Sequence, residues 1–196
     1  MSSLRRAVFL DRDGVLVEDV ECLAEHERIR VYDGIPAALQ TLKSAGYALV
    51  VVSNQTVVSR GICTEEQVVS INAEIGARIL RAGGPNLDAN YFCPHHPKAT
   101  LERYRVVCEC RKPSPGMMLR AAREWGLDLA GSFMIGDRIT DIVAGRRAGC
   151  KTIWVQTGQH LAPQIYTTEP VDSNITADHI CPGLPEAARW IVENHP

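Results

Sequence analysis

The sequence predicts an α/β fold, a Rossmann-like parallel sheet with helices on both faces. Apolar runs rich in β-branched residues alternate along the chain with segments of helical periodicity. The runs are continuously apolar, which is typical of strands that crossover helices bury on both faces. Several of them end abruptly in polar side chains, and right-handed crossovers bring such strand ends to one edge of the sheet. We therefore expect a functional site at that edge.

Composition limits the class of protein. The chain has 196 residues, of which 45% are hydrophobic and 22% charged, enough for a full core, and we expect a single domain over 1–196. The net charge of -2 argues against nucleic-acid binding through a broad basic surface. The polar start, Met1–Arg6, leads into an apolar run that stops at Asp11, too soon for a signal-peptide core or a membrane span. We expect a cytoplasmic protein with no membrane contact.

The first strand is the apolar run Ala7–Leu10, which ends in the sequence Asp11–Gly14. Side chains alternate along a strand, so Asp11 and Asp13 are expected to share one side while the arginine between them points away. Crowded carboxylates repel one another unless a cation or a proton separates them. Residues from about 15 to 31 show no sustained period and are predicted to form a flap over the site.

The remaining elements follow in alternation. A helix with proline in its first turn is expected over 34–46, and a buried strand over 47–52 ends in Ser53-Asn54-Gln55. Residues 56–63 are predicted to be a connecting loop, after which Thr64 and Gln67 form the capping box of a helix. The elements predicted after this helix are, in order, strand 89–92, a cysteine-rich segment, a helix from Ser114-Pro115 to Trp125, strand 133–137, a helix to Gly149, strand 152–155, a weakly patterned tail, and a closing helix over 185–192.

The polar strand ends carry the chemistry of phosphoryl transfer. Three of them carry Asp11 with Asp13, Ser53 with Asn54, and Asp137. Lys112 lies just before the helix predicted to begin at Ser114-Pro115. Transfer of a phosphoryl group needs a nucleophile, a divalent metal that neutralises charge, and donors for the phosphoryl oxygens. This set of side chains supplies all three.

A second pattern lies in the zinc loop predicted at about 93–110. Cys93, His95, Cys108 and Cys110 offer three thiolates and one imidazole, a set suited to a closed, structural tetrahedral zinc site. Each pair is separated by one residue instead of the more usual two to four, so reduced free thiols stay open as the alternative. The odd count of seven cysteines argues against a disulfide framework.

Four motifs resemble those of the haloacid dehalogenase superfamily of phosphatases, in that family's order. They are Asp11–Gly14, Ser53–Gln55, Arg111–Pro113 and Gly136-Asp137-Arg138-x-x-Asp141. Within the superfamily, the Cys93–Pro97 segment, the Cys-x-Cys-Arg-Lys-Pro run and Arg60-Gly61 look most similar to the heptose 1,7-bisphosphate 7-phosphatases. The resemblance implies the haloacid dehalogenase fold without a large cap domain, Mg²⁺ and Zn²⁺ as cofactors, a sugar phosphate as substrate, and a monomer.

The resemblance also implies individual roles. Asp11 would attack phosphorus to form an aspartyl-phosphate, and Asp13 would protonate the leaving oxygen and later activate water. Mg²⁺ would bind Asp11, the Asp13 backbone carbonyl and Asp137, while Ser53 and Lys112 hold phosphoryl oxygens. Asp141 either orients metal-bound water or simply begins a helix, where acids are favoured. The substrate-binding residues expected are Asn54, Gln55, Thr56, Arg60, Arg111 and Arg138.

Two departures from the family concern the substrate. Thr56–Ser59 replaces the usual Ser-Gly-Ile-Ala and puts β-branched Val57 where a glycine stands, and the flap lacks the usual Gly-Tyr-Val-His. One alternative is therefore a histidinol-phosphate phosphatase or another sugar-phosphate phosphatase. The other alternative belongs to a different class: a non-catalytic zinc-bearing interaction protein.

Overall fold

The computed structural model describes residues 4–20, 22–158 and 175–196. Within these ranges the strands form one parallel sheet in the order β3-β2-β1-β4-β5-β6. The strands are β1 (Arg5–Leu10), β2 (Ala48–Asn54), β3 (Ala89–Cys93), β4 (Leu127–Gly136), β5 (Lys151–Val155) and β6 (His179–Cys181). The helices are α1 (Ile35–Ser44), α2 (Thr56–Ser59), α3 (Glu65–Arg81), α4 (Gly116–Trp125), α5 (Ile139–Ala148) and α6 (Leu184–Asn194). The predicted α/β fold is confirmed.

The strand order explains where a site can form. The chain builds the sheet outward from β1 toward β3 and then resumes on the other side of β1 with β4. The order therefore reverses between β1 and β4. In open α/β sheets, ligands bind beyond the carboxyl ends of the strands at such a switch point.

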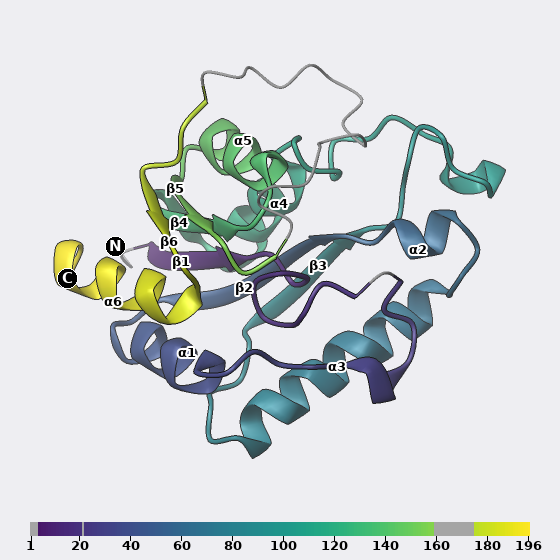
Figure 1. Ribbon diagram of the computed structural model, residues 1–196. Coiled ribbons are helices and arrows are strands. Elements are labelled where there is room, and N and C mark those ends of the chain that lie inside the picture. Colours follow the sequence, from purple (N-terminus) through teal and green to yellow (C-terminus); the bar gives the residue numbers. More distant parts are fainter. Residues whose placement is uncertain (1–3, 21, 159–174) are drawn as a thin grey trace.

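Helices cover both faces of the sheet, with α1, α3 and α6 on one side and α4 and α5 on the other (Figure 1). Strand β1 shows why its sequence is continuously apolar. Val8 and Leu10 pack into the core on the α1 side, while Ala7 and Phe9 pack into the core on the α4 side. Alternating side chains thus meet apolar surroundings on both faces.

Between β1 and α1 the chain forms a short flap in place of a large cap domain. Its apolar residues Leu16, Val17 and Ile29 are buried in the same core as α1 and α3. The flap contains one turn of 3-10 helix, His26–Arg28. None of the described helices is long and apolar enough to cross a membrane.

Helix α3 begins as its sequence predicts. Thr64 and Gln67 form the reciprocal capping box, and the helix buries an apolar stripe that includes Ile71, Ile75 and Ile79. Each capping interaction satisfies a backbone N–H that the first turn leaves without a partner.

Two local predictions were wrong, and one strand was not predicted. Residues 56–63 are not all loop, because Val57 and Val58 pack against Val68 and Tyr104 and form the short helix α2. Ser114 does not cap α4, whose N-cap is Pro115 without a side-chain bond. The weakly patterned tail contains β6, which pairs with β5, and its central part (159–174) lies outside the described residues.

Candidate active site

Three buried carboxylates meet at the switch point. Asp11 follows the end of β1, Asp137 follows the end of β4, and Asp141 lies in the first turn of α5. One oxygen of each lies within 4.8 Å of the others. Gly14 permits this packing, because it adopts a left-handed φ of 81° and a Cβ there would collide with the Asp137 carboxylate. Oxygen-only ligands of this kind suit a hard divalent cation such as Mg²⁺.

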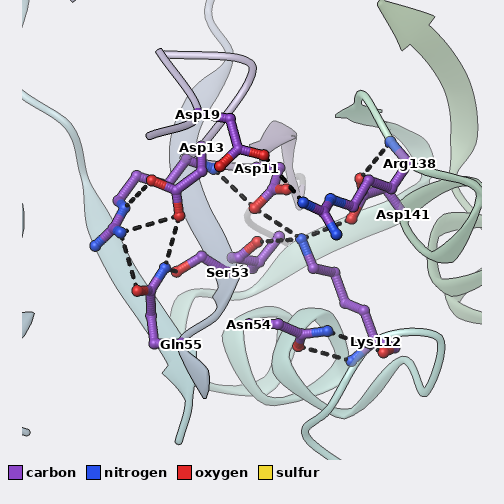
Figure 2. A network of polar contacts seen from close by, with 11 residues as sticks. Asp11, Asp13, Asp19, Ser53, Asn54, Gln55, Lys112, Arg138 and Asp141 are labelled. Carbon is purple, nitrogen blue, oxygen red and sulfur yellow. Dashed lines mark hydrogen bonds and ion pairs between the residues drawn. The ribbon is translucent and has the colours of Figure 1, made fainter. Parts of the chain in front are cut away.

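Lys112 supplies the positive charge of the cluster (Figure 2). Its side chain is 2% exposed, and Nζ lies 2.9 Å from Asp11 Oδ1 and 2.7 Å from Asp141 Oδ1. Nζ also donates a hydrogen bond of 2.8 Å to the Val52 carbonyl in β2. One buried ammonium therefore joins β1, β2 and α5.

Burial and neighbouring charges have opposing effects on the pKa values in this cluster. Burial raises the pKa of Asp11 to about 7; Lys112 acts against this rise, while Asp141 and Asp13 add to it. For Lys112, burial lowers the pKa, but the carboxylates of Asp11 and Asp141 outweigh burial and raise the pKa overall. Lys112 therefore stays charged, and it is the group that favours the Asp11 carboxylate.

Asp141 takes part in two interactions. Its Oδ1 pairs with Lys112, and its Oδ2 accepts a 3.0 Å hydrogen bond from the Arg138 backbone N–H at the start of α5. The sequence left a choice between a role at the metal and a role at the helix end. The structure gives Asp141 a helix-capping contact and, through its other oxygen, contact with the central lysine.

Asp13 is held by the side chain of its neighbour. Arg12 donates from Nε to Asp13 Oδ1 at 3.0 Å and from Nη2 to Asp13 Oδ2 at 2.9 Å. The expectation that Arg12 simply points away is wrong. Its side chain is buried, and its guanidinium returns to grip the second carboxylate in a bidentate pair.

The residues at the end of β2 orient other parts of the site. Gln55 donates to Asp13 Oδ2 at 2.9 Å and to Ser53 Oγ at 3.3 Å. Asn54 donates to the Lys112 carbonyl and accepts from the Lys112 backbone N–H, both at 3.0 Å. Both amides, which the sequence assigned to substrate binding, therefore have hydrogen-bond partners within the protein.

Two of the arginines expected to bind substrate contact the flap. Arg138 pairs with Asp19 at 2.9 Å, and Arg60 donates from Nη1 to Cys22 Sγ at 3.4 Å. Thr56 is the first residue of α2 and is partly exposed. The flap and the loops after β2 and β4 are thus connected around the mouth of the site.

The predicted zinc ligands converge. The ligand atoms of Cys93, His95, Cys108 and Cys110 all lie within 4.8 Å of one another. Five of the six pairs are separated by 3.2 Å (Cys110 Sγ to Cys93 Sγ) to 3.8 Å (Cys93 Sγ to His95 Nδ1). Ligands at ordinary Zn–S and Zn–N bond lengths around a tetrahedron stand about 3.5 to 3.8 Å apart. The hydrogen bond between Cys110 and Cys93 lowers the pKa of Cys110 to about 5, which favours a thiolate there. The donor set fits zinc.

Arg111 connects this cluster to the carboxylate site. Its Nη1 donates to the His95 carbonyl at 3.1 Å, and Lys112 follows it directly in the chain. Burial lowers the pKa of Arg111, and the thiol groups of the cluster counteract that effect. The position of Lys112 therefore depends on the order of the cysteine loop.

Sequence reasoning missed three residues of the site. Arg12 had no assigned role, although an arginine between two acids is itself a signal for pairing. Asn72 lies on the buried stripe of α3 and accepts from Arg12 Nη1 at 3.1 Å. Its signal was a polar residue beside Ile71 on an apolar helix face. Asp19 lies in the flap, where no periodicity marked it.

Comparison with known proteins agrees with this geometry. The family model described as HAD-hydrolase-like matches residues 109–187. A crystal structure of D,D-heptose 1,7-bisphosphate phosphatase from B. bronchiseptica, complexed with magnesium and phosphate, is 29% identical with a TM-score of 0.79, covering 96% of this chain and 98% of that one. A D,D-heptose 1,7-bisphosphate phosphatase from Burkholderia thailandensis, at 23% identity and a TM-score of 0.66, shares the fold and covers 97% of this chain and 100% of that one.

Fold and site together define a haloacid dehalogenase-like phosphatase. The curated relatives narrow the class further. The D-glycero-β-D-manno-heptose-1,7-bisphosphate 7-phosphatase of Photorhabdus laumondii is 41% identical over 186 residues, 94% of this chain and 96% of the relative. That of Escherichia coli K12 is 38% identical over 184 residues, 93% of each chain. The chain belongs to the family of D-glycero-β-D-manno-heptose-1,7-bisphosphate 7-phosphatases.

Proposed function

We propose that this protein hydrolyses the 7-phosphate of D-glycero-β-D-manno-heptose 1,7-bisphosphate through an aspartyl-phosphate intermediate. The observation that carries the reaction type is the buried cluster of Asp11, Asp137 and Asp141, in which Lys112 pairs with Asp11 and Asp141. The substrate follows from the relatives at about 40% identity over nearly the whole chain.

In the first step Asp11 attacks phosphorus and the bond between phosphorus and the sugar oxygen breaks. Asp13 gives its proton to that oxygen, so the sugar leaves as a neutral alcohol. Lys112, within 2.9 Å of Asp11, keeps the nucleophile ionised and balances charge on the phosphoryl group. The Ser53 hydroxyl donates to a phosphoryl oxygen.

In the second step Asp13 takes a proton from water, which attacks the aspartyl-phosphate and releases inorganic phosphate. Asp13 thus ends the cycle protonated, as it began. Mg²⁺, when bound by Asp11, Asp137 and the Asp13 carbonyl, would supply charge neutralisation for the transferred group. Asp141 supports both steps through its contact with Lys112.

The sugar and its second phosphate would lie toward the flap. Thr56, Arg60, Arg111 and Arg138 are the candidates for these contacts, and the arginines supply the bidentate donors that phosphate favours. For Asn54 and Gln55 we propose positioning roles instead, since their amides contact Lys112 and Asp13.

A magnesium-dependent assay tests this function. The protein should release phosphate from heptose 1,7-bisphosphate, and ³¹P NMR of the product should show the phosphate at C1 retained. Release of the C1 phosphate instead would overturn the proposed regiochemistry. A flat response with magnesium across a panel of sugar phosphates would favour the non-catalytic alternative.

We also propose that the protein is a cytoplasmic monomer of one domain. The described cysteines form no disulfide, which is usual for a reducing compartment. One parallel sheet includes strands from both ends of the described chain, which supports a single domain. Sedimentation velocity at micromolar concentration should give a single species close to 21.6 kDa.

Zinc in the cysteine cluster is the second metal of this proposal. Cys110→Ser should lower zinc content from about one ion per chain to nearly none and loosen the segment that carries Arg111 and Lys112, because zinc binding contributes directly to folding. Elemental analysis and the thermal midpoint provide the readouts.

Cys150→Ser is the matched control for that substitution. Cys150 is also buried, but it is not among the four candidate zinc ligands. It should retain full zinc content even if it melts earlier. Normal zinc in Cys110→Ser, or no zinc in metal-replete wild-type protein, would contradict the assignment.

A further inference from the structure

Arg12 is an unusual group to find in the interior. Its residue is 2% exposed, and its side chain lies among the flap, β2 and α3. A buried cation is costly unless hydrogen bonds and an opposite charge compensate it. All three guanidinium nitrogens have acceptors, and Asp13 is the one acidic residue among these partners.

The acceptors come from separate elements and fix the direction of the guanidinium. Nη1 donates to Asn72 Oδ1 in α3 at 3.1 Å, and Nη2 donates to Gln55 Oε1 at 2.9 Å as well as to Asp13. Gln55 then closes the ring, because its Nε2 donates to Asp13 Oδ2 at 2.9 Å. Both oxygens of Asp13 are thereby held by donors that cannot rotate freely.

Asn72 is a second polar residue in apolar surroundings. It is 6% exposed on the buried face of α3, where Ile71 and Ile75 pack into the core. An apolar residue at such a position would ordinarily stabilise the helix more than an amide does. The amide is accounted for by its contact with Arg12.

We propose that Arg12 is a positioning residue for Asp13, with Asn72 and Gln55 fixing the angle of its guanidinium. The proposal rests on the proposed function, in which Asp13 moves a proton to and from the leaving oxygen. Arg12 contacts no reacting atom. It determines where the Asp13 carboxyl stands when the sugar oxygen departs.

The chemistry gives this role a specific signature. As the bond from phosphorus to the sugar oxygen breaks, an alkyl oxygen needs the proton of Asp13, because an alkoxide is a poor leaving group. A p-nitrophenolate leaves well without a proton. Displacing Asp13 should therefore slow hydrolysis of the sugar phosphate far more than hydrolysis of p-nitrophenyl phosphate.

The experiment compares kcat/KM for the two substrates, since kcat/KM covers only the steps up to departure of the leaving group. Arg12→Lys keeps a charge but loses the bidentate guanidinium. It should lower kcat/KM about 100-fold for heptose 1,7-bisphosphate and about 3-fold or less for p-nitrophenyl phosphate. Asn72→Leu, a milder change, should lower the ratio of the two values about 10-fold, and Asn72→Asp, which keeps an acceptor oxygen, should restore most of it.

Ile75→Ala is the control for simple loss of packing on α3. It should lower the thermal midpoint without changing the ratio of the two kcat/KM values. Equal losses on both substrates in Arg12→Lys and Asn72→Leu, or no loss on either, would overturn the positioning role. Should Arg12→Lys fail to fold, Asn72→Leu decides. Absence of wild-type turnover on both substrates would instead reject the phosphatase function itself.

Discussion

Asp11→Asn should lower kcat/KM for every phosphomonoester substrate roughly 10⁴-fold or more while leaving the fold intact. Asparagine has the shape of aspartate, but its amide has no nucleophilic carboxylate oxygen to form the acyl phosphate, so the covalent route is lost. The effect should be equal for sugar and aryl phosphates, because both need the same nucleophile. Steady-state kinetics with saturating magnesium and a thermal melt measure the two parts of the prediction.

The stability of this variant follows from the electrostatics of the site. Burial raises the pKa of Asp11 to about 7, and Asp141 and Asp13 add to the rise, so the ionised carboxylate is held there at a cost. Asparagine removes that charge and keeps an oxygen facing Lys112. We expect a metal-free thermal midpoint equal to or above that of the wild type.

Asp178→Asn is the matched control, since Asp178 contacts Thr152 in β5 and lies outside the carboxylate cluster. It should retain wild-type kinetics. Substantial phosphatase activity in purified Asp11→Asn would eliminate Asp11 as the nucleophile.

Lys112→Met should have the second largest effect. Methionine is apolar and of similar length, so the substitution leaves the carboxylates of Asp11 and Asp141 without the ammonium that they share. Removal of one partner of a buried ion pair typically costs about 3–5 kcal/mol of folding free energy. The pKa of Asp11 should rise further, because the charge of Lys112 is the largest influence that lowers it.

Activity should fall about 1,000-fold in Lys112→Met, since both the ionised nucleophile and a phosphoryl contact are lost. Urea denaturation and steady-state kinetics test the two effects separately. Lys43→Met is the control: Lys43 pairs with Asp88 near the surface, so its loss should cost about 1 kcal/mol or less and leave kcat unchanged. A Lys112→Met protein as stable and active as Lys43→Met would contradict this account of the cluster.

The fold was predictable from sequence wherever one local signal determined the element. The continuous apolar runs of β1 and β2 and the capping box at Thr64 each predicted a structure that formed. The carboxyl ends of β1 and β4 brought Asp11 and Asp137 together, as parallel topology requires, and Lys112 joins them from the loop before α4.

The parts that sequence reasoning missed depend on contacts between distant segments. Helix α2 forms because Val57 and Val58 find apolar partners in α3 and the cysteine loop, which no local pattern records. Strand β6 has only three residues and is a strand because it pairs with β5. The link from Arg12 to Asn72 spans 60 positions in the chain, and only the packing of α3 against the flap creates it.

The interior roles of Asn54 and Gln55 were hidden for the same reason. A polar residue after a strand is as compatible with a ligand as with a neighbouring loop. In the structure the partners are the Lys112 backbone for Asn54 and the Asp13 carboxylate for Gln55.

The most direct test of the proposed function is the ratio of kcat/KM values for D-glycero-β-D-manno-heptose 1,7-bisphosphate and for histidinol phosphate, measured with magnesium on the same preparation. The α anomer, run in parallel, measures how strongly the flap and the α2 loop discriminate. We predict a ratio of about 100 or more in favour of the heptose, because its second phosphate adds charged contacts with arginine. A ratio near or below one would contradict the heptose assignment and point to histidinol phosphate or another phosphomonoester as the substrate.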